Sequence, residues 1–173
     1  MNQKTLFTVY HRSNSNNHLE KLNFEKADSE DSVFGQAIYF SSSSDTTSQL
    51  GHYMGKYEIV LDNPLNLNIE FSPNRANELM NIFIKKYDIE DDEYDFNNEY
   101  DVVSYGNLFL EIQEFSWGES SKYIHDFITS YLGFNSFYHY SDYGTNFIDD
   151  FGDYGFCYGV YNENDIKFID FAN

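Results

Sequence analysis

The sequence predicts an α+β protein that forms a single domain over residues 1–173. The predicted strands do not alternate regularly with the predicted helices, which favours α+β over a doubly wound sheet. The length fits one domain and is sufficient to bury a core without disulfides. Hydrophobic residues make up 41% of the chain and aromatic residues 20%. Because disordered chains are poor in aromatic residues, we expect this chain to fold.

The first part of the chain carries two predicted strands separated by a polar loop. Residues 6–10 (LFTVY) are rich in β-branched and aromatic residues, as strands are. Residues 12–33 are polar without a clear period, so we expect a loop that can hold a short helix. Residues 37–40 (AIYF) form the second predicted strand. The serines after it favour a turn or a helix cap, because their hydroxyls compete for backbone hydrogen bonds.

A helix and a third strand are predicted next. Ser44 or Asp45 is the predicted N-cap of a helix that runs toward Met54. Gly55 is expected to end it, because glycine adopts the left-handed conformation common at helix C-termini. Residues 57–61 (YEIVL) then predict a strand, which Asp-Asn-Pro closes.

The clearest helix begins at Ser72 and Pro73. Serine can cap the helix, and proline in its first turn has no hydrogen-bond donor to leave unpaired. Apolar residues at helical spacing predict one buried face, formed by Ala76, Leu79, Met80, Phe83 and Tyr87. Residues 89–101 are dense in carboxylates and predict a solvated loop.

A second amphipathic helix is predicted from near Ser120 to a stop at Gly133. Its apolar face consists of Ile124, Phe127, Ile128, Tyr131 and Leu132. The rest of the chain is rich in Tyr, Phe and Gly. It predicts three strands joined by long turns, at residues 136–140, 157–161 and 166–169.

The charge of the chain is strongly negative. Ten Lys and Arg stand against 29 Asp and Glu, for a net charge of -19. Direct binding to nucleic acid is not expected, because it depends on neutralising phosphates with basic side chains. Such a surface can attract basic proteins, including proteins that hold DNA or RNA; the alternative is that the acidity only keeps the protein soluble.

No metal site and no membrane partner are predicted. The five His show no close ligand spacing, and residues 90–101 lack the Gly and closing Glu of a calcium-binding EF-hand loop. Cys157 is the only cysteine, which suits a reducing compartment. No apolar run approaches membrane-spanning length, and the N-terminal residues lack the apolar stretch of a secretory signal. We therefore expect a cytoplasmic location, in the producing cell or in a target cell.

Five stretches occur in the order found in one enzyme family. They are VYHRSN at 9–14, FGQAIYFSSSS at 34–44, KYEIVLDNPLNLN at 56–68, GFNSFY at 133–138 and CYGVYNENDIK at 157–167. Together they resemble the ADP-ribosyltransferase superfamily, especially its diphtheria-toxin and poly(ADP-ribose)-polymerase branch, in the form of a phage or bacterial effector or toxin. The resemblance spans nearly the whole chain. It implies an ADP-ribosyltransferase-like split antiparallel β-sheet core with flanking helices.

The resemblance implies that the protein uses NAD. His11 matches the family's ribose-binding His, and Tyr39 matches a Tyr that packs on nicotinamide, so these two are the expected catalytic residues. Breaking the bond between nicotinamide and ribose passes through a transition state like an oxocarbenium ion. An aromatic ring can hold the nicotinamide, and a nearby carboxylate can stabilise the developing positive charge.

Four further residues complete the NAD site that the resemblance implies. Arg12 and Ser13 follow His11 directly, and Ser41 stands where the family uses a small residue to shape the nicotinamide pocket. The family's second stacking Tyr falls at Leu50. Tyr53 can replace it if the predicted helix is shifted.

The sequence departs from the family at two positions. Arg12 stands where this branch has Gly after the His, and Cys157 aligns with the catalytic Glu. A thiol cannot supply a carboxylate's charge at neutral pH unless its pKa is strongly lowered. Asp150, Asp153 and Glu163 are the carboxylates that can take its place, whereas Cys157 itself fits a small buried hydrophobic residue.

These features leave two main hypotheses for function. The first is an NAD-dependent mono-ADP-ribosyltransferase that modifies a protein target. The second is a catalytically decayed, acidic inhibitor that mimics nucleic acid and blocks a basic DNA- or RNA-binding protein, such as a nuclease of a defence system. An immunity protein or antitoxin that neutralises a basic partner is a variant of the second hypothesis that the sequence does not separate from it.

Overall fold

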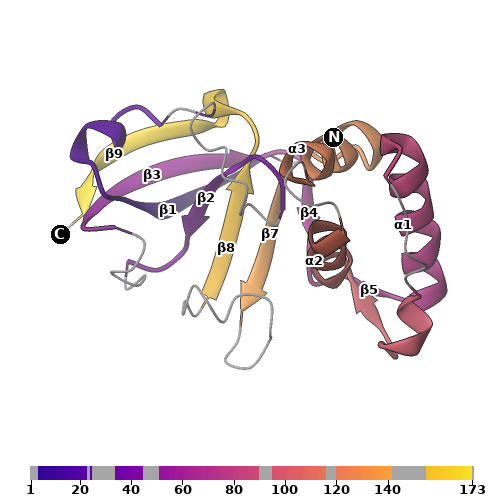
Figure 1. Cartoon of the computed structure of the whole chain (residues 1–173). Helices are drawn as coiled ribbons and strands as arrows, with labels where there is room; N and C mark the ends of the chain where they lie inside the picture. Colours follow the sequence, from indigo (N-terminus) through magenta and orange to yellow (C-terminus); the bar gives the residue numbers. More distant parts are fainter. Residues whose placement is uncertain are drawn as a thin grey trace.

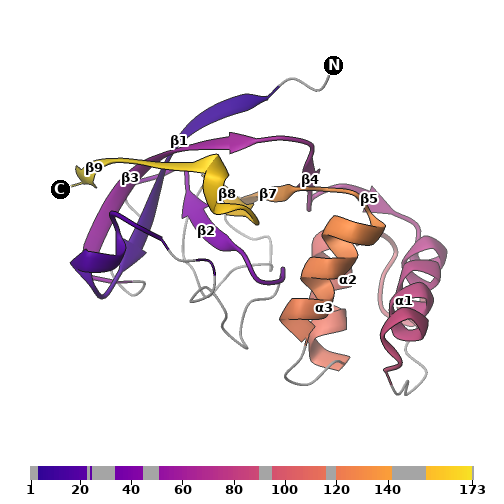
Figure 2. The same cartoon turned by 90° about the horizontal axis from the view of Figure 1, so that it is seen from above.

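A seven-stranded sheet with helices at one end of it makes up the protein (Figure 1, Figure 2). The computed structural model describes residues 4–22, 24, 34–44, 51–89, 95–115, 120–141 and 155–172. The strands of the sheet are β1 (Thr5–Ser13), β2 (Ile38–Ser41), β3 (Tyr53–Leu61), β4 (Pro64–Asn66), β7 (Ser136–Ser141), β8 (Gly155–Val160) and β9 (Ile166–Ala172). One large sheet combined with helices is the α+β class that the sequence predicts.

The sheet consists of two parts joined by a short contact. Its strand order is β4-β7-β8-β2-β1-β3-β9, and neighbouring strands are antiparallel except for β4 and β7, which are parallel. β1 pairs with β3 over nine residue pairs, whereas β1 and β2 pair only at Tyr10 and Ser41. The sheet therefore divides between β1 and β2, and we call this point the fork.

The helices lie beside β4 and β7 (Figure 2). They are α1 (Pro73–Tyr87), α2 (Tyr105–Phe115) and α3 (Ser120–Asp126), which continues as a π-helical turn over Phe127–Tyr131. Two short strands, β5 (Glu70–Phe71) and β6 (Val103–Ser104), form a separate two-stranded sheet. Short 3-10 turns lie at Asn16–His18, Phe96–Asn98 and Glu163–Asp165.

The helix predicted to begin at Ser72 is confirmed as α1. The Ser72 hydroxyl accepts a hydrogen bond from the backbone N–H of Arg75 at 3.4 Å, and Pro73 occupies the first turn. The predicted face is buried at Ala76, Leu79, Met80 and Phe83. Asp88, with a left-handed φ of 54°, ends the helix where glycine is more usual.

The second predicted helix is confirmed as α3 and its π-helical continuation. The predicted face is buried at Ile124, Phe127 and Ile128. Tyr131 was predicted on the same face but is 45% exposed. In the π-helical turn, the backbone N–H of Leu132 donates to the carbonyl of Phe127, five residues back, so the following side chains are rotated away from the α-helical positions.

The helix predicted to run toward Met54 does not reach that residue. β3 already begins at Tyr53, and both Met54 and Gly55 pair with β1. Residues 45–50 of the predicted helix lie outside the described residues. Because β1 extends to Ser13, its last backbone groups need hydrogen-bond partners, and the residues from Tyr53 onward supply them. The other predicted strands are confirmed, most of them with longer bounds.

Two hydrophobic clusters lie on opposite faces of the sheet. The helix-side cluster includes Phe34, Leu65, Leu79, Phe83, Phe109, Phe127, Phe137 and Tyr161. The far-side cluster consists of Val9, Ile38, Phe40, Tyr57, Ile59, Leu61, Tyr158 and Val160. Successive side chains of a strand point to opposite faces, so in β2 the neighbours of Tyr39 pack in the far-side cluster while Tyr39 packs against the helix-side cluster.

Gly159 in β8 gives a test of this packing. It pairs with Phe137 of β7, and a Cβ atom at Gly159 would overlap the Phe137 ring. We expect Gly159→Ala to lower the free energy of unfolding by about 1–3 kcal/mol, measured by urea denaturation, because the ring must leave its place. Adding Phe137→Leu makes room, so the double variant should lose less than the sum of the two single losses. An additive loss would contradict the proposed overlap.

Candidate functional site

The fork between β1 and β2 is held by a side chain rather than by a continuous ladder. The Nδ1 of His11 donates a hydrogen bond to the backbone carbonyl of Tyr39 at 2.8 Å. The imidazole lies 5.7 Å from the ring of Phe40 and 6.3 Å, edge-on, from the ring of Tyr57, measured between ring centroids. The His11 side chain therefore satisfies a carbonyl of β2 at the place where β1 and β2 no longer pair.

The environment of His11 favours the neutral form of its imidazole. Burial lowers the pKa of His11, and the hydrogen bond to Tyr39 offsets this in part. A carbonyl oxygen can only accept, so the proton of the neutral ring lies on Nδ1. The Nε2 atom then carries a lone pair and acts as a hydrogen-bond acceptor.

The ring of Tyr39 lies on the other face of the sheet. It contacts Phe137 with ring centroids 5.6 Å apart, and its hydroxyl donates to the backbone carbonyl of Gly35 at 3.1 Å. The structure thus brings His11 to the backbone of Tyr39 but places the two rings in different clusters. One small ligand cannot contact both rings in this arrangement.

Three of the expected site residues gather beyond the fork, where β1 ends. The Arg12 guanidinium donates to the backbone carbonyls of Gly51 and Ser44, both at 3.4 Å. The Ser13 hydroxyl accepts a hydrogen bond from a backbone N–H two residues later, in the turn after β1. Tyr53 lies opposite Ser13 in β3 and is 46% exposed. Arg12, Ser13 and Tyr53 are therefore neighbours on adjoining strands.

Ser41 belongs to a row of polar residues that crosses three strands. It pairs with Cys157 of β8, and Cys157 pairs in turn with His139 of β7. Ser41 and His139 are buried, and Cys157 is half-buried. Residues directly opposite in an antiparallel pair share a face, so the three side chains adjoin. Sequence reasoning missed His139, although its place among the alternating residues of the predicted strand 136–140 was a signal.

Among the described residues, no carboxylate lies close enough to Cys157 to replace the catalytic Glu that the resemblance implies there. Glu163 is exposed and lies in the turn after β8, beyond the end of the strand opposite to Cys157. Asp150 and Asp153 lie outside the described residues. Among the described residues, no group of three or more His, Cys, Asp or Glu side chains is arranged to hold a metal ion.

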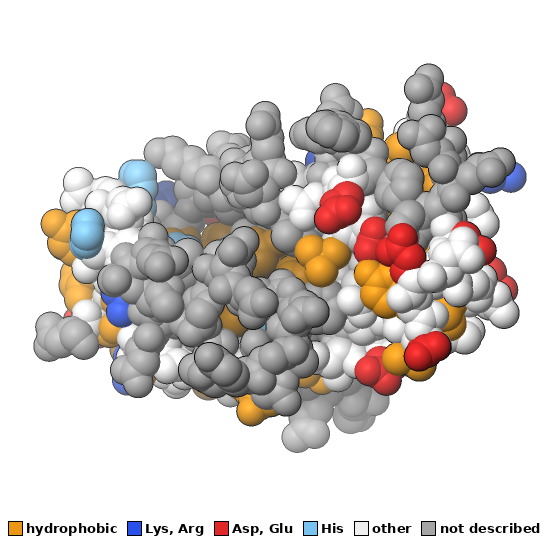
Figure 3. Space-filling model, turned by 60° about the horizontal axis from the view of Figure 1, so that its bottom comes forward, with side chains coloured by type: hydrophobic (Ala, Val, Ile, Leu, Met, Phe, Trp, Pro, Cys, Tyr) orange, Lys and Arg blue, Asp and Glu red, His pale blue; other side chains and the backbone are white. Residues whose placement is uncertain are grey.

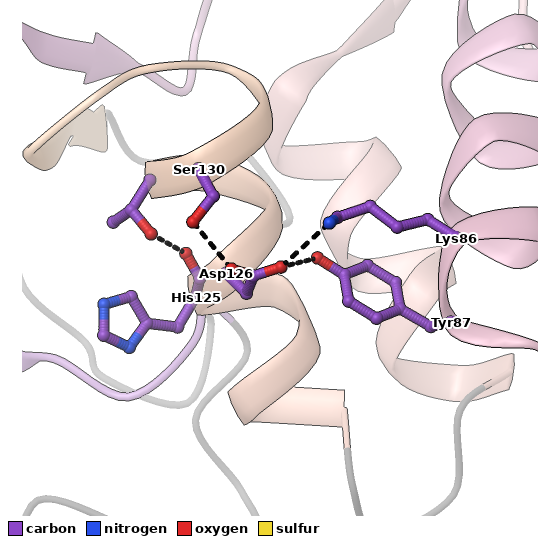
Figure 4. Close-up of polar contacts among 6 residues, drawn as sticks. Lys86, Tyr87, His125, Asp126 and Ser130 are labelled. Carbon is purple, nitrogen blue, oxygen red and sulfur yellow. Dashed lines mark hydrogen bonds and ion pairs between the residues drawn. The ribbon is translucent and has the colours of Figure 1, made fainter.

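A separate polar cluster joins α1 to α3 (Figure 4). Asp126 accepts hydrogen bonds from the hydroxyls of Ser130 at 2.6 Å and Tyr87 at 2.5 Å, and forms an ion pair with Lys86 at 3.3 Å. The hydrogen bonds from Ser130 and Tyr87 lower the pKa of Asp126 to about 2. Both carboxylate oxygens are engaged within the protein, so the cluster connects helices and is not a candidate catalytic site.

Acidic side chains gather on the half of the surface that the helices form (Figure 3). Eight of the 14 residues from 88 to 101 are Asp or Glu, and none is Lys or Arg. The described exposed acidic residues of this half are Glu70, Glu78, Asp88, Glu99, Asp101 and Glu114. Ile69 and Val102 are exposed next to them in the sequence.

Comparisons with known proteins leave the family open. No protein-family model matches the sequence, and no curated protein matches it significantly. The crystal structure of an anti-CRISPR protein is similar with a TM-score of 0.41 and 14% identity, over 95% of this chain and 96% of that chain. A likeness at this level establishes neither a shared fold nor a shared function. In the described part of the chain, no helix has the length and apolar character to cross a membrane.

Asp126 gives a prediction for the pH dependence of stability. The pKa of Asp126 in the folded protein is about 2, below its usual value of 3.8. The ionised carboxylate therefore contributes fully to the free energy of unfolding above about pH 4, and this contribution is lost as the pH falls through about 2. We expect Asp126→Asn to lower the free energy of unfolding near pH 7 by about 1 kcal/mol, a modest value because the side chain is 43% exposed.

Urea denaturation of both proteins at several pH values measures this difference. The two curves should converge near pH 2. A difference that persists there would contradict the assignment. Glu78→Gln, which removes a single exposed ion pair with Arg75, is the matched control and should change stability little.

Proposed function

We propose that the protein is a phage or bacterial effector of the ADP-ribosyltransferase type, which binds NAD at the fork and transfers ADP-ribose to a protein target in the cytoplasm. The observation that carries the proposal is the hydrogen bond from Nδ1 of His11 to the backbone carbonyl of Tyr39, which fixes the imidazole at the fork. Its Nδ1 proton is committed to Tyr39, so its Nε2 is an acceptor with a fixed orientation. A ribose hydroxyl of NAD is a donor that suits this atom.

The positions of the family-like stretches in the sheet support the proposal. β1 contains the His of VYHRSN, β2 contains IYFS, and β8 contains CYGV. These segments are far apart in the sequence but are neighbours in the strand order β8-β2-β1. The division of the sheet between β1 and β2 also agrees with the split sheet that the resemblance implies.

The surroundings of the fork suit binding better than they suit transfer. Arg12 and Ser13 lie directly after His11, and Tyr53 is exposed beside them. Ser13 and Tyr53 share the face of the sheet that carries His11, and a dinucleotide is long enough to reach them from it. Tyr39 is left out of the proposed contact because its ring faces the helix-side cluster. A thiol at Cys157 does not supply the charge that a carboxylate would.

Binding of NAD can be tested directly through stability. A ligand that binds only the folded state stabilises it, by about 2.7 kcal/mol at 100 times its Kd. We expect NAD to raise the melting temperature of the protein in a concentration-dependent manner. His11→Ala should abolish most of this shift, because it removes the acceptor.

For each variant, the melting temperature with NAD is compared with that of the same variant without NAD. This is needed because His11→Ala also removes the hydrogen bond to Tyr39 and lowers the stability of the protein before any ligand is added. His18→Ala, which changes an exposed His in the turn after β1, is the control and should keep the full shift. The proposal fails if NAD produces no shift in the natural protein at any concentration tested.

The charge distribution favours a second candidate function, an acidic inhibitor of a basic nucleic-acid-binding protein. The acidic residues of the helical half adjoin the exposed Ile69 and Val102, and partner-binding surfaces combine charge with apolar area in this way. Complementary charge would speed association and set the choice of partner. This function needs no carboxylate at Cys157.

The second candidate predicts salt-sensitive competition with nucleic acid for a basic nuclease. Replacing Glu99 by Gln and Asp101 by Asn should weaken the competition about fivefold at low salt, and the difference should shrink as salt is raised. Displacement of labelled DNA from the nuclease measures both effects. Glu163→Gln with Asp165→Asn removes the same charge beyond β8 and should have little effect. Equal effects of the two pairs would contradict a localised surface.

A further inference from the structure

Cys157 lies between two glycines on one face of β8. Successive residues of a strand alternate between faces, so Gly155, Cys157 and Gly159 share the face that carries Phe137. The ring of Phe137 occupies the space over Gly159. At Gly155, a Cβ atom would meet only the Ser42 hydroxyl among the described residues. Cys157 itself is half-buried, so solvent reaches the residue and small molecules can approach it.

His139 of β7 lies directly opposite Cys157 and on the same face. Opposed residues of an antiparallel pair have Cβ atoms about 4.5–5.5 Å apart. An imidazole nitrogen at that separation can reach the sulfur after a side-chain rotation. The two residues are therefore placed to exchange a proton.

The imidazole of His139 is buried with an unused nitrogen. The residue is 4% exposed, and its Nε2 has no hydrogen-bond partner among the described residues. A buried polar atom without a partner calls for an explanation, because most such atoms in folded proteins are paired. Burial lowers the pKa of His139, while a hydrogen bond with the backbone of Tyr140 acts in the opposite direction. A neutral ring with an unused nitrogen can accept the proton of a neighbouring thiol.

The pair of Cys157 and His139 is separate from the proposed NAD site. Ser41 adjoins Cys157 on the other side and pairs with Tyr10 of β1. His11 follows Tyr10, so its side chain points to the opposite face of the sheet. A molecule that reacts at the thiol has no contact with His11, and the inference below does not rest on the proposed function.

We propose that Cys157 is a modification site that forms mixed disulfides with small organic disulfides, with His139 as the base. In the step, Nε2 of His139 takes the thiol proton, and the sulfur of Cys157 forms a bond to one sulfur of the disulfide. The bond between the two disulfide sulfurs breaks, and the leaving thiolate takes the proton from His139. Cys157 is oxidised and the disulfide is reduced, so the step needs no further oxidant.

The composition of the chain decides what happens to the product. Cys157 is the only cysteine, so no second thiol of the same chain can displace the attached group. The mixed disulfide therefore persists until an external thiol attacks it.

The activation of the thiol is tested with 4,4′-dithiodipyridine, which releases one coloured product for each thiol that reacts. The rate near pH 7 reports on Cys157 alone. We expect the folded protein to react about tenfold faster than the same chain unfolded in urea, because a base assists the thiol only in the fold. His139→Gln should remove this advantage, and His52→Gln, at an exposed position, should retain it.

The comparison with the unfolded chain uses no variant, so it decides the question even if His139→Gln does not fold. A folded rate equal to or below the unfolded rate overturns the pairing of Cys157 with His139. A rate that is unchanged in a folded His139→Gln variant overturns it as well.

The product is tested by intact-mass measurement after incubation with cystamine, a small cationic disulfide that suits a chain with a net charge of -19. We expect the folded protein to gain the mass of one cysteamine group, which dithiothreitol removes and Cys157→Ser prevents. A folded protein that gains no such mass, under conditions in which the unfolded chain does, overturns the assignment of Cys157 as a modification site.

Discussion

One hydrogen bond, from the His11 imidazole to the Tyr39 carbonyl, makes the division of the sheet possible. Inside a sheet, a strand that loses its neighbour exposes backbone groups that must find other partners. β1 and β2 separate after a single residue pair, and the imidazole supplies the missing donor. The same bond fixes which nitrogen carries the proton and how the ring is oriented. The features that make His11 a candidate NAD-binding residue are therefore consequences of the way in which the sheet is held together.

The alternation of side chains along β2 separates the molecule into two chemical environments. The far-side cluster surrounds His11, and the helix-side cluster contains Tyr39 together with the row of Ser41, Cys157 and His139. The family resemblance places His11 and Tyr39 in one NAD site, because each matches a residue of the family's NAD-binding motifs. The structure instead associates Cys157 with a buried His that has no counterpart among the quoted motifs. The side chains of His11 and Cys157 therefore lie on opposite faces of the sheet.

Much of the fold follows from local patterns in the sequence. Helical spacing and a serine cap were sufficient for α1, and β-branched and aromatic stretches were sufficient for β1, β7, β8 and β9. The beginning of β3 was missed because Gly55 favours a helix end locally, whereas pairing with β1 decides its conformation. β5 and β6 have only two residues each, too few for any period. The neighbours of the candidate site residues depend on strand register. Cys157 lies opposite His139 because of the long-range pairing of β7 with β8, which no short sequence motif records.

The pairing of β2 with β8 has a consequence for how the chain reaches its native state. It joins Ile38 to Val160, so more than a hundred residues must be looped out before β2 gains that neighbour. β1 and β3 are much closer in sequence and can form a hairpin-like unit early. Contacts between distant residues slow folding because the entropy of loop closure is lost before they form. We therefore expect a late, slow phase in refolding in which β8 docks, with the fork the last part of the sheet to close.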